Sequence, residues 1–520
     1  MIDPILLEVF KNRTSAIAEE MGVILQRTSY SPNIKERRDF SCAIFNNKGE
    51  LIAQAAHIPV HLGSMPMSVL ETIKSISFEE GDMVVLNDPY KGGTHLPDIT
   101  LIAPVFIDGK LQFFVANRAH HSDIGGASPG SMPISNSIFQ EGFIIPPVKL
   151  VKKGHIDKEI FALIKNNVRT PEEREGDFNA QIMANITGIK RLKELVQKYS
   201  LKTVNLYMNA LLDYSEKIMR NKIKEIPDGV YSYEDYMEDD GLGNTEIKIA
   251  VEISIKNDEA IVDFTKSDPQ TEGSINAVKA ITMSAVYYVF RSLLSSDVPT
   301  NAGCFRPVKI ITKKGTIVDC NHPAAVSAGN VETSQRIVDV VLGALSKAIP
   351  EEIPAASQGT MNNITIGGIN PETNQPFTYY ETIGGGMGAS VKTDGESAIQ
   401  SHMTNTLNTP VEALEFEYPF QIVRYSIRKN SGGNGFHKGG NGIIREIKLL
   451  ADAQVTVISE RRKIAPYGLF GGEAGETGKN IVIKNGKKEI KPSKFSEKLK
   501  TGNIIRIETP GGGGYGNPTS

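Results

Sequence analysis

Histidines and aspartates gather in one stretch of the sequence, residues 87–126. It contains His95, His120 and His121, which are three of the nine histidines in the chain, together with Asp98 and Asp123. Imidazole and carboxylate groups at short spacing are the ligands that divalent metal ions use in proteins. The stretch therefore predicts a metal centre, although a lone histidine at a strand end is more often a surface or core residue.

A β-hairpin is expected to position these side chains. Residues 99–107 and 111–119 have the composition of strands, and Asp108-Gly109-Lys110 reads as a three-residue turn. That turn would pair Asp98 with His120 on one face of the hairpin. Cross-strand neighbours lie roughly 5 Å apart at Cβ, which is close enough to share a metal ion.

A two-residue Asp-Gly turn would instead pair Asp98 with His121. It would also set apolar Val105 opposite polar Gln112. We favour the first register, and hence His120, because it leaves the other face of the hairpin uniformly apolar, with Ile99, Leu101, Ala103, Val105, Leu111, Phe113 and Val115.

His95 precedes Asp98 by three residues, and Pro97 lies between them. Proline disfavours a helical conformation of the preceding residue, Leu96. His95 and Asp98 are therefore expected to converge from a loop and not from one face of a helix.

The flanking segments predict helices and a second hairpin. A helix is expected over residues 4–27, with Asp3 as its N-cap. Residues 39–45 and 50–53 predict a hairpin that turns Cys42 towards the core. His57 and His61 are expected in a loop before a helix at 65–76. A helical tract is expected over 156–223, broken near Tyr199-Ser200.

These patterns predict a mixed α/β (α+β) protein with several lobes. We expect a metal-site region of antiparallel hairpins at 1–150 and a helical segment at 151–225. An α/β region is expected at 226–410, and a β-rich, glycine-rich region at 411–520.

Composition excludes several classes of protein. The chain has 520 residues, a formal net charge of −3 and three cysteines. No long basic or acidic block is present, which argues against nucleic-acid and anionic-membrane partners. The apolar runs are too short to span a bilayer, and the first residues do not resemble a signal peptide. Three cysteines without paired spacing favour a reduced, cytoplasmic protein.

One glycine-rich loop, Gly384 to Gly388, has two interpretations. Its backbone amides could cradle an anion, or it could be a tight structural turn. It is not a P-loop, and neither a GxxxxGK[ST] motif nor a GxGxxG motif between strand and helix occurs in the chain.

Over nearly its whole length the sequence resembles the hydantoinase B/5-oxoprolinase family. The motifs that carry the resemblance are RRDFSCAIF, HIPVHLGSMP, NDPYKGGTHLPDI, NRAHHSDIGG, GSINAVKA, NAGCFRPV, GNVETSQR, SGGNGFHKGGNGIIRE and PGGGGYG. Together they are highly specific, whereas no single one is.

The resemblance implies a site for one divalent metal ion, Zn²⁺, Mn²⁺ or Fe²⁺. Its ligands would be Asp39, His95, Asp98 and His120. It agrees with the choice of His120 and adds Asp39, which spacing alone does not place. It also implies that ATP is used by a separate A-type partner subunit or by the other half of a fused chain, consistent with the absence of a nucleotide-binding motif here.

The activity implied by the resemblance is ATP-dependent hydrolysis of a cyclic amide, such as a hydantoin, 5-oxoproline or another lactam. The partner would phosphorylate the amide oxygen, and activated water at the metal site would then attack. His121 or Asp123 would orient water or carry protons. The alternatives are a subunit of an ATP-dependent ketone carboxylase and a scaffold whose metal only stabilises the fold.

Overall fold

A seven-stranded sheet holds the residues singled out in the sequence. The computed structural model describes residues 2–55 and 58–518, so His57 lies outside the described residues. The sheet has the order β2-β1-β5-β4-β3-β6-β7 and antiparallel pairing throughout. Its strands are β1 (Phe40–Asn46), β2 (Leu51–Ala55), β3 (Met83–Leu86), β4 (Asp98–Ile107), β5 (Lys110–His120), β6 (Val148–Lys152) and β7 (His155–Ile156).

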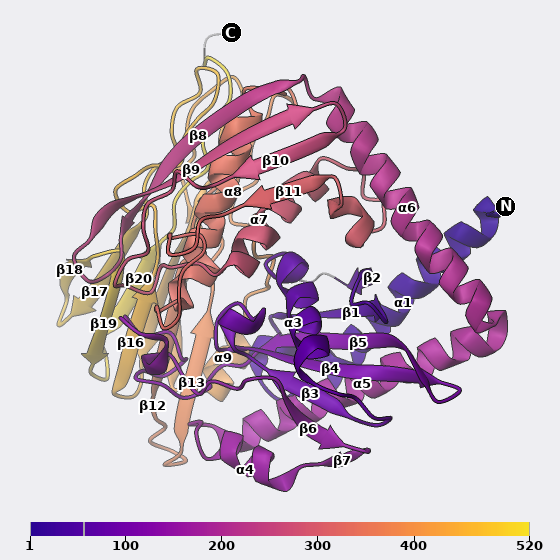
Figure 1. Cartoon of the computed structure of the whole chain (residues 1–520). Coiled ribbons are helices and arrows are strands. Elements are labelled where there is room, and N and C mark those ends of the chain that lie inside the picture. The colour runs from indigo at the N-terminus through magenta and orange to yellow at the C-terminus, as the bar shows by residue number, and fades with distance from the viewer. Residues whose placement is uncertain (1, 56–57, 519–520) are drawn as a thin grey trace.

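Helices cover both faces of this sheet (Figure 1). On one face, α1 (Pro4–Thr28) and α5 (Pro171–Tyr199) pack against β1, β4 and β5, as predicted for the amphipathic N-terminal segment. On the other face lies α3 (His61–Ser75), whose Met65 and Val69 join a small core with Phe45, Ile102 and Phe114. The short helix α2 (Pro32–Lys35) leads into β1.

The β4–β5 hairpin has the predicted register but not the predicted turn. Asp98 pairs with His120, as expected. The turn has two residues, Asp108 and Gly109, both with positive φ, which is the geometry that an Asp-Gly pair favours. A β-bulge at Gln112 then shifts the register by one residue, because Phe106 pairs with Leu111 while Val105 pairs with Phe113.

The bulge also changes the face on which one residue lies. Leu111 was expected among the apolar residues that face α1 and α5. It packs instead against the core on the α3 side, with Phe114. The predicted face is correct for Ile99, Leu101, Ala103, Val105, Phe113 and Val115, all of which are buried in the large core.

The predicted helical tract consists of three helices, α4 (Lys158–Lys165), α5 and α6 (Leu201–Glu225). The break lies at Ser200, as predicted, where φ is 67°. In Figure 1, α5 runs below the seven-stranded sheet, and α6 rises from it towards the second sheet.

The second sheet has the order β11-β10-β9-β8 and packs on α8. Its pairs are antiparallel except β10 with β11. The elements of this region are β8 (Gly229–Asp239), β9 (Thr245–Lys256), β10 (Glu259–Asp263), α7 (Lys279–Ser292), β11 (Val308–Ile311), a π-helical turn (Gly329–Thr333) and α8 (Ser334–Leu345).

Two further sheets share a separate hydrophobic core near the C-terminus. One has the order β13-β12-β16-β19 and the other β14-β15-β20-β17-β18. The elements are β12 (Asn363–Ile369), β13 (Pro376–Glu381), α9 (Val411–Glu417), β14 (Phe420–Arg428), β15 (Gly442–Leu449), β16 (Ala453–Ile458), β17 (Lys479–Lys484), β18 (Lys487–Lys491), β19 (Lys494–Leu499) and β20 (Ile504–Glu508).

The architecture confirms the predicted mixed α/β class with antiparallel sheets and a β-rich C-terminal region. The boundaries at 150, 225 and 410 stay a prediction. The large core runs from Phe10 to Ile458 and draws on residues from all four expected segments.

The glycine loop at Gly384–Gly388 packs tightly against other backbone. A β-carbon on Gly386 would lie 2.0 Å from the Gly440 oxygen and 2.3 Å from the Gly512 nitrogen. The backbone amides of residues 385–387 donate to the backbone oxygens of Ile399, Pro510 and Glu396, respectively. The amide of Gly388 donates to the Ser357 hydroxyl. The structural-turn interpretation is therefore correct, because these four amides have no hydrogen left for an anion.

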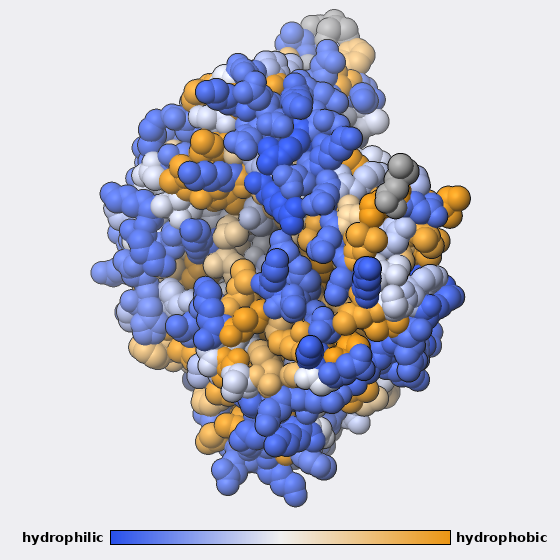
Figure 2. All heavy atoms as spheres, turned by 45° about the vertical axis from the view of Figure 1, so that its right-hand side comes forward, coloured by the Kyte–Doolittle hydropathy of each residue, from blue (hydrophilic) through white to orange (hydrophobic). Residues whose placement is uncertain are grey.

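The surface mixes polar and apolar side chains. On the face in Figure 2, hydrophilic atoms predominate, and apolar atoms form several patches separated by hydrophilic ones. Within the described residues, no helix combines the length and apolarity needed to cross a membrane. The three cysteines, Cys42, Cys304 and Cys320, are buried free thiols, and Cys42 lies in the core as predicted.

We expect Gly63 to be required for close packing of α3 on α7. A β-carbon at Gly63 would lie 2.7 Å from the Ser284 backbone nitrogen. Alanine gains ~1 kcal/mol of helix propensity, but overpacking costs ~1–3 kcal/mol, and here the clash is with backbone, which yields little. Gly63→Ala should therefore lower the melting temperature.

The control is Lys74→Ala at the exposed end of the same helix, where side-chain changes alter stability by less than ~0.5 kcal/mol. Calorimetry of both variants measures the difference. A Gly63→Ala protein that melts at or above the control would contradict this account of the helix crossing.

Candidate metal centre

Three adjacent strands bring the predicted ligands to one end of the seven-stranded sheet. Asp98 begins β4 and His120 ends β5, and the two are direct cross-strand partners. Asp39 immediately precedes β1, the next strand, and its backbone oxygen accepts a hydrogen bond from the His120 amide at 3.0 Å. His95 lies in the turn before β4, where the Asp98 amide donates to the His95 oxygen at 3.1 Å.

His95, Asp98 and His120 form a compact group of potential ligands. One ligand atom from each lies within 4.8 Å of the others, and all three residues are buried. The His95 Nε2 atom is 3.4 Å from Asp98 Oδ2, and the His95 and His120 rings lie 5.0 Å apart at their centroids. The Thr94 hydroxyl donates to Asp98 Oδ2 and holds that carboxylate in place.

The unpaired atoms of this group fit a divalent cation. Both ring nitrogens of His95, Oδ1 of Asp98 and Nε2 of His120 are buried and have no hydrogen-bond partner within the described residues. Leaving buried polar atoms unsatisfied is costly. A cavity of about 20 Å³ adjoins Asp98 and His120. Two imidazoles and a carboxylate suit Zn²⁺, Mn²⁺ or Fe²⁺.

Asp39 lines the same cavity, although it is not part of the compact group. Burial raises the pKa of its carboxyl to about 7, and Arg37 opposes that rise. The neighbouring Asp98 charge raises the pKa further. A cation between the two carboxylates would relieve both the burial cost and their repulsion.

Deep burial also affects the pKa values of Asp98 and His120. Burial raises the pKa of Asp98, but the ion-pair partners His95 and His61 outweigh it and hold that pKa well below its ordinary value. Burial, with a smaller contribution from His95, lowers the pKa of His120 well below its ordinary value. Asp98 is thus charged and His120 neutral, which are the forms that bind metal.

Residues from distant parts of the chain hold His120 in place. The Asn33 side-chain amide on α2 lies 2.8 Å from His120 Nδ1, while His120 Nε2 has no hydrogen-bond partner within the described residues. On β13, the Tyr380 ring stacks on the imidazole at 4.4 Å between centroids. The buried guanidinium of Arg37 lies over the Tyr380 ring. It donates to Asn33 Oδ1 at 2.7 Å and to the backbone oxygen of Tyr380 at 3.0 Å.

His61 belongs to the centre but was not predicted there. Sequence reasoning placed it in a loop before a helix at 65–76, whereas the helix begins at His61. Its Nε2 atom is 3.6 Å from Asp98 Oδ2, and its Nδ1 atom contacts the Ser41 hydroxyl at 3.0 Å. The signal was present in the motif HIPVHLG, where His61 lies two residues after Pro59, at the start of the helix.

The other two predicted site residues have partners elsewhere. The His121 Nε2 atom contacts Gln181 of α5 at 3.0 Å, and its ring packs against Phe178. Asp123 pairs with Arg169 at 2.8 Å and accepts from the amides of Gly125 and Gly130. The hydrogen bonds of both side chains thus support α5 and the loop after β5, and their expected catalytic roles stay a prediction.

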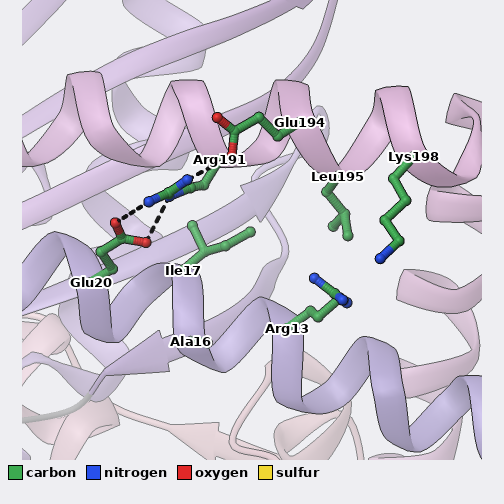
Figure 3. Close-up of a pocket in the computed structure, with 8 residues that line it drawn as sticks. All are labelled: Arg13, Ala16, Ile17, Glu20, Arg191, Glu194, Leu195 and Lys198. Carbon is green, nitrogen blue, oxygen red and sulfur yellow. Dashed lines mark hydrogen bonds and ion pairs between the residues drawn. The ribbon is translucent and has the colours of Figure 1, made fainter.

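A larger groove lies between α1 and α5, away from the centre. It has a volume of about 370 Å³. Figure 3 shows that Arg191 is held there by Glu20, with a bidentate contact at 2.7 and 2.8 Å. Glu194 completes the pairing of Arg191 at 2.8 Å. The groove lacks buried unpaired ligand atoms, so the cavity at His120 is the better candidate for chemistry.

Known proteins share both the sequence and the fold. The 5-oxoprolinase 1 of Arabidopsis thaliana is 43% identical over 99% of this chain, which spans only 42% of that protein. The crystal structure of the ATP-dependent caprolactamase from Pseudomonas jessenii superimposes with a TM-score of 0.93. It is 31% identical, and the match covers 100% of this chain and 92% of that one.

A nucleotide-free acetone carboxylase has the same fold, with a TM-score of 0.92 over 99% of this chain and 76% of that one, at 19% identity. Residues 3–518 match the family model for hydantoinase B/oxoprolinase. The chain therefore belongs to the hydantoinase B/oxoprolinase family.

Proposed function

We propose that this chain is the metal-binding subunit of an ATP-dependent enzyme that hydrolyses cyclic amides. The observation that carries the proposal is the buried group of unpaired ligand atoms on His95, Asp98 and His120. It is supported by relatives named 5-oxoprolinase and by the similarity to a caprolactamase.

The chain spans about two fifths of the 5-oxoprolinases that it matches, but 92% of the matched caprolactamase chain. We infer that ATP is used by a separate A-type subunit, which phosphorylates the amide oxygen. The three free cysteines fit a reducing compartment such as the cytoplasm.

Asp39, His95, Asp98 and His120 would hold the ion in this proposal. A divalent ion bound there would supply a Lewis acid that makes water a nucleophile near neutral pH. Thr94 and Asn33 would hold the Asp98 carboxylate and the His120 ring in the orientation needed for binding. The buried walls, which include Ile58 and Val60, would exclude bulk water from the reacting amide.

The two adjacent histidines provide a matched test of the metal site. We expect His120→Ala to weaken metal binding by at least about tenfold, because it removes a ligand. His121→Ala should retain the metal, because the contacts of His121 are with Gln181 and Phe178. Metal analysis of folded, gel-filtered protein measures the content of each. The reverse pattern would contradict the assignment of His120.

The activity is expected only in the assembled enzyme. The purified chain alone should open no lactam ring, whereas the complex with the A-type subunit and ATP should hydrolyse one or more of hydantoin, 5-oxoproline and caprolactam. In that complex, Asp98→Asn should reduce ring opening by more than about 100-fold, because several kcal/mol of charge stabilisation are lost.

The control for this substitution is Asp213→Asn, whose side chain is 76% exposed. Ring opening by the isolated chain would contradict the need for a partner. Full turnover by a folded, assembled Asp98→Asn complex would indicate a metal that only stabilises the fold.

A ketone carboxylase remains the second candidate, since an acetone carboxylase has the same fold. Labelled bicarbonate separates the two reactions. The hydrolase proposal expects ATP consumption with ring opening and no incorporation of label into product. ATP-dependent transfer of label to a ketone would overturn it.

A further inference from the structure

The cavity beside Asp98 and His120 has a second polar wall. Asn330, Thr382 and Thr404 line it, and none of them belongs to the group of potential metal ligands. Asn330 lies on the π-helical turn Gly329–Thr333, an uncommon geometry that is frequent at functional sites.

The backbone of Asn330 is hydrogen-bonded, but its side-chain oxygen has no hydrogen-bond partner within the described residues. The residue is 4% exposed, and its backbone oxygen accepts from the Ser334 hydroxyl at 2.6 Å. Its side-chain Oδ1 is buried and has no hydrogen-bond partner within the described part of the chain. A buried carboxamide left in this state costs free energy, which a polar ligand would recover.

Unsatisfied polar atoms continue along the segments next to Asn330. Gln335 Oε1, Gln400 Oε1 and Ser401 Oγ are also buried without a partner in the described residues. Gln335 donates to the Ser401 oxygen at 3.0 Å, and Gln400 donates to the hydroxyl of Thr382 at 3.2 Å. Of these four residues, Asn330 is the one that lines the cavity.

A carboxamide presents a donor and an acceptor on one planar edge. A small cyclic amide does the same, because its ring holds the N–H and the C=O cis to each other. We propose that Asn330 hydrogen-bonds the amide edge of the cyclic substrate, with Oδ1 accepting from the ring N–H. This inference rests on the proposed function and assigns to Asn330 the selection of secondary cyclic amides.

The cavity of about 20 Å³ has room for only one water molecule or ion. A cyclic amide is larger, so its binding requires part of the wall to move. Met403 and Thr404 line the cavity and belong to a segment in which residues 404–410 form neither helix nor strand. Asn330, on its hydrogen-bonded turn, provides the rigid side of the site.

The test compares lactams with lactones of the same ring size, which have no N–H. Calorimetry measures the binding of 5-oxoproline, caprolactam and their lactone counterparts to the metal-loaded chain. The wild-type protein should bind the better lactam about five- to tenfold more tightly than its lactone, the effect of one net hydrogen bond. Asn330→Ala should abolish this preference and retain the metal, whereas Asn330→Asp, whose carboxylate still accepts from a ring N–H, should keep both the preference and the metal.

The matched control is Val331→Ala, which changes the same wall without changing a hydrogen-bonding group. It should alter both affinities by the same factor. Absence of lactam preference in the wild type, its persistence in Asn330→Ala, or its loss in a folded, metal-loaded Asn330→Asp protein would overturn the inference, as would failure of both lactams to bind. Ring opening by the assembled enzyme is measured separately. Its absence would contradict the proposed function, whereas the binding experiment tests the role of Asn330.

Discussion

The centre depends on keeping charged and unpaired ligand atoms away from water. Asp98 is charged and buried, and the free nitrogens of His95 and His120 lie beside it. Burial of a charge is costly unless the charge is paired or bound to a cation. The end of the seven-stranded sheet, two helices and a distant strand surround these atoms and leave a cavity of about 20 Å³.

The arrangement is supported from both halves of the chain. Arg37 lies beside β1, yet it donates to Tyr380 and Thr382 near the end of β13. Tyr380 stacks on His120, and its hydroxyl donates to Asn363 at 2.8 Å. The C-terminal sheets therefore support the candidate centre, although its potential metal ligands all lie within the first 120 residues.

Two adjacent histidines at the end of β5, His120 and His121, have different surroundings. His120 is directed into the cavity, while His121 contacts Gln181 and Phe178 of α5 on the opposite side of the sheet. One residue is available to bind a cation, and the next joins the sheet to its covering helix. The same alternation places Asp39 and Ser41 on the side of the centre and Phe40 and Cys42 in the large core.

The sequence by itself determined the hairpin, the pairing of Asp98 with His120, and a loop approach for His95. Alternating apolar residues specify which face of a strand is buried, so these features are local. The sequence left the two-residue Asp-Gly turn open as an alternative, and only the tertiary structure showed that this turn combines with a bulge at Gln112 and that His61 lies beside Asp98 at the start of α3. It also brought Tyr380 and Asn330 to the cavity, because contacts between residues hundreds of positions apart leave no periodic pattern in the sequence.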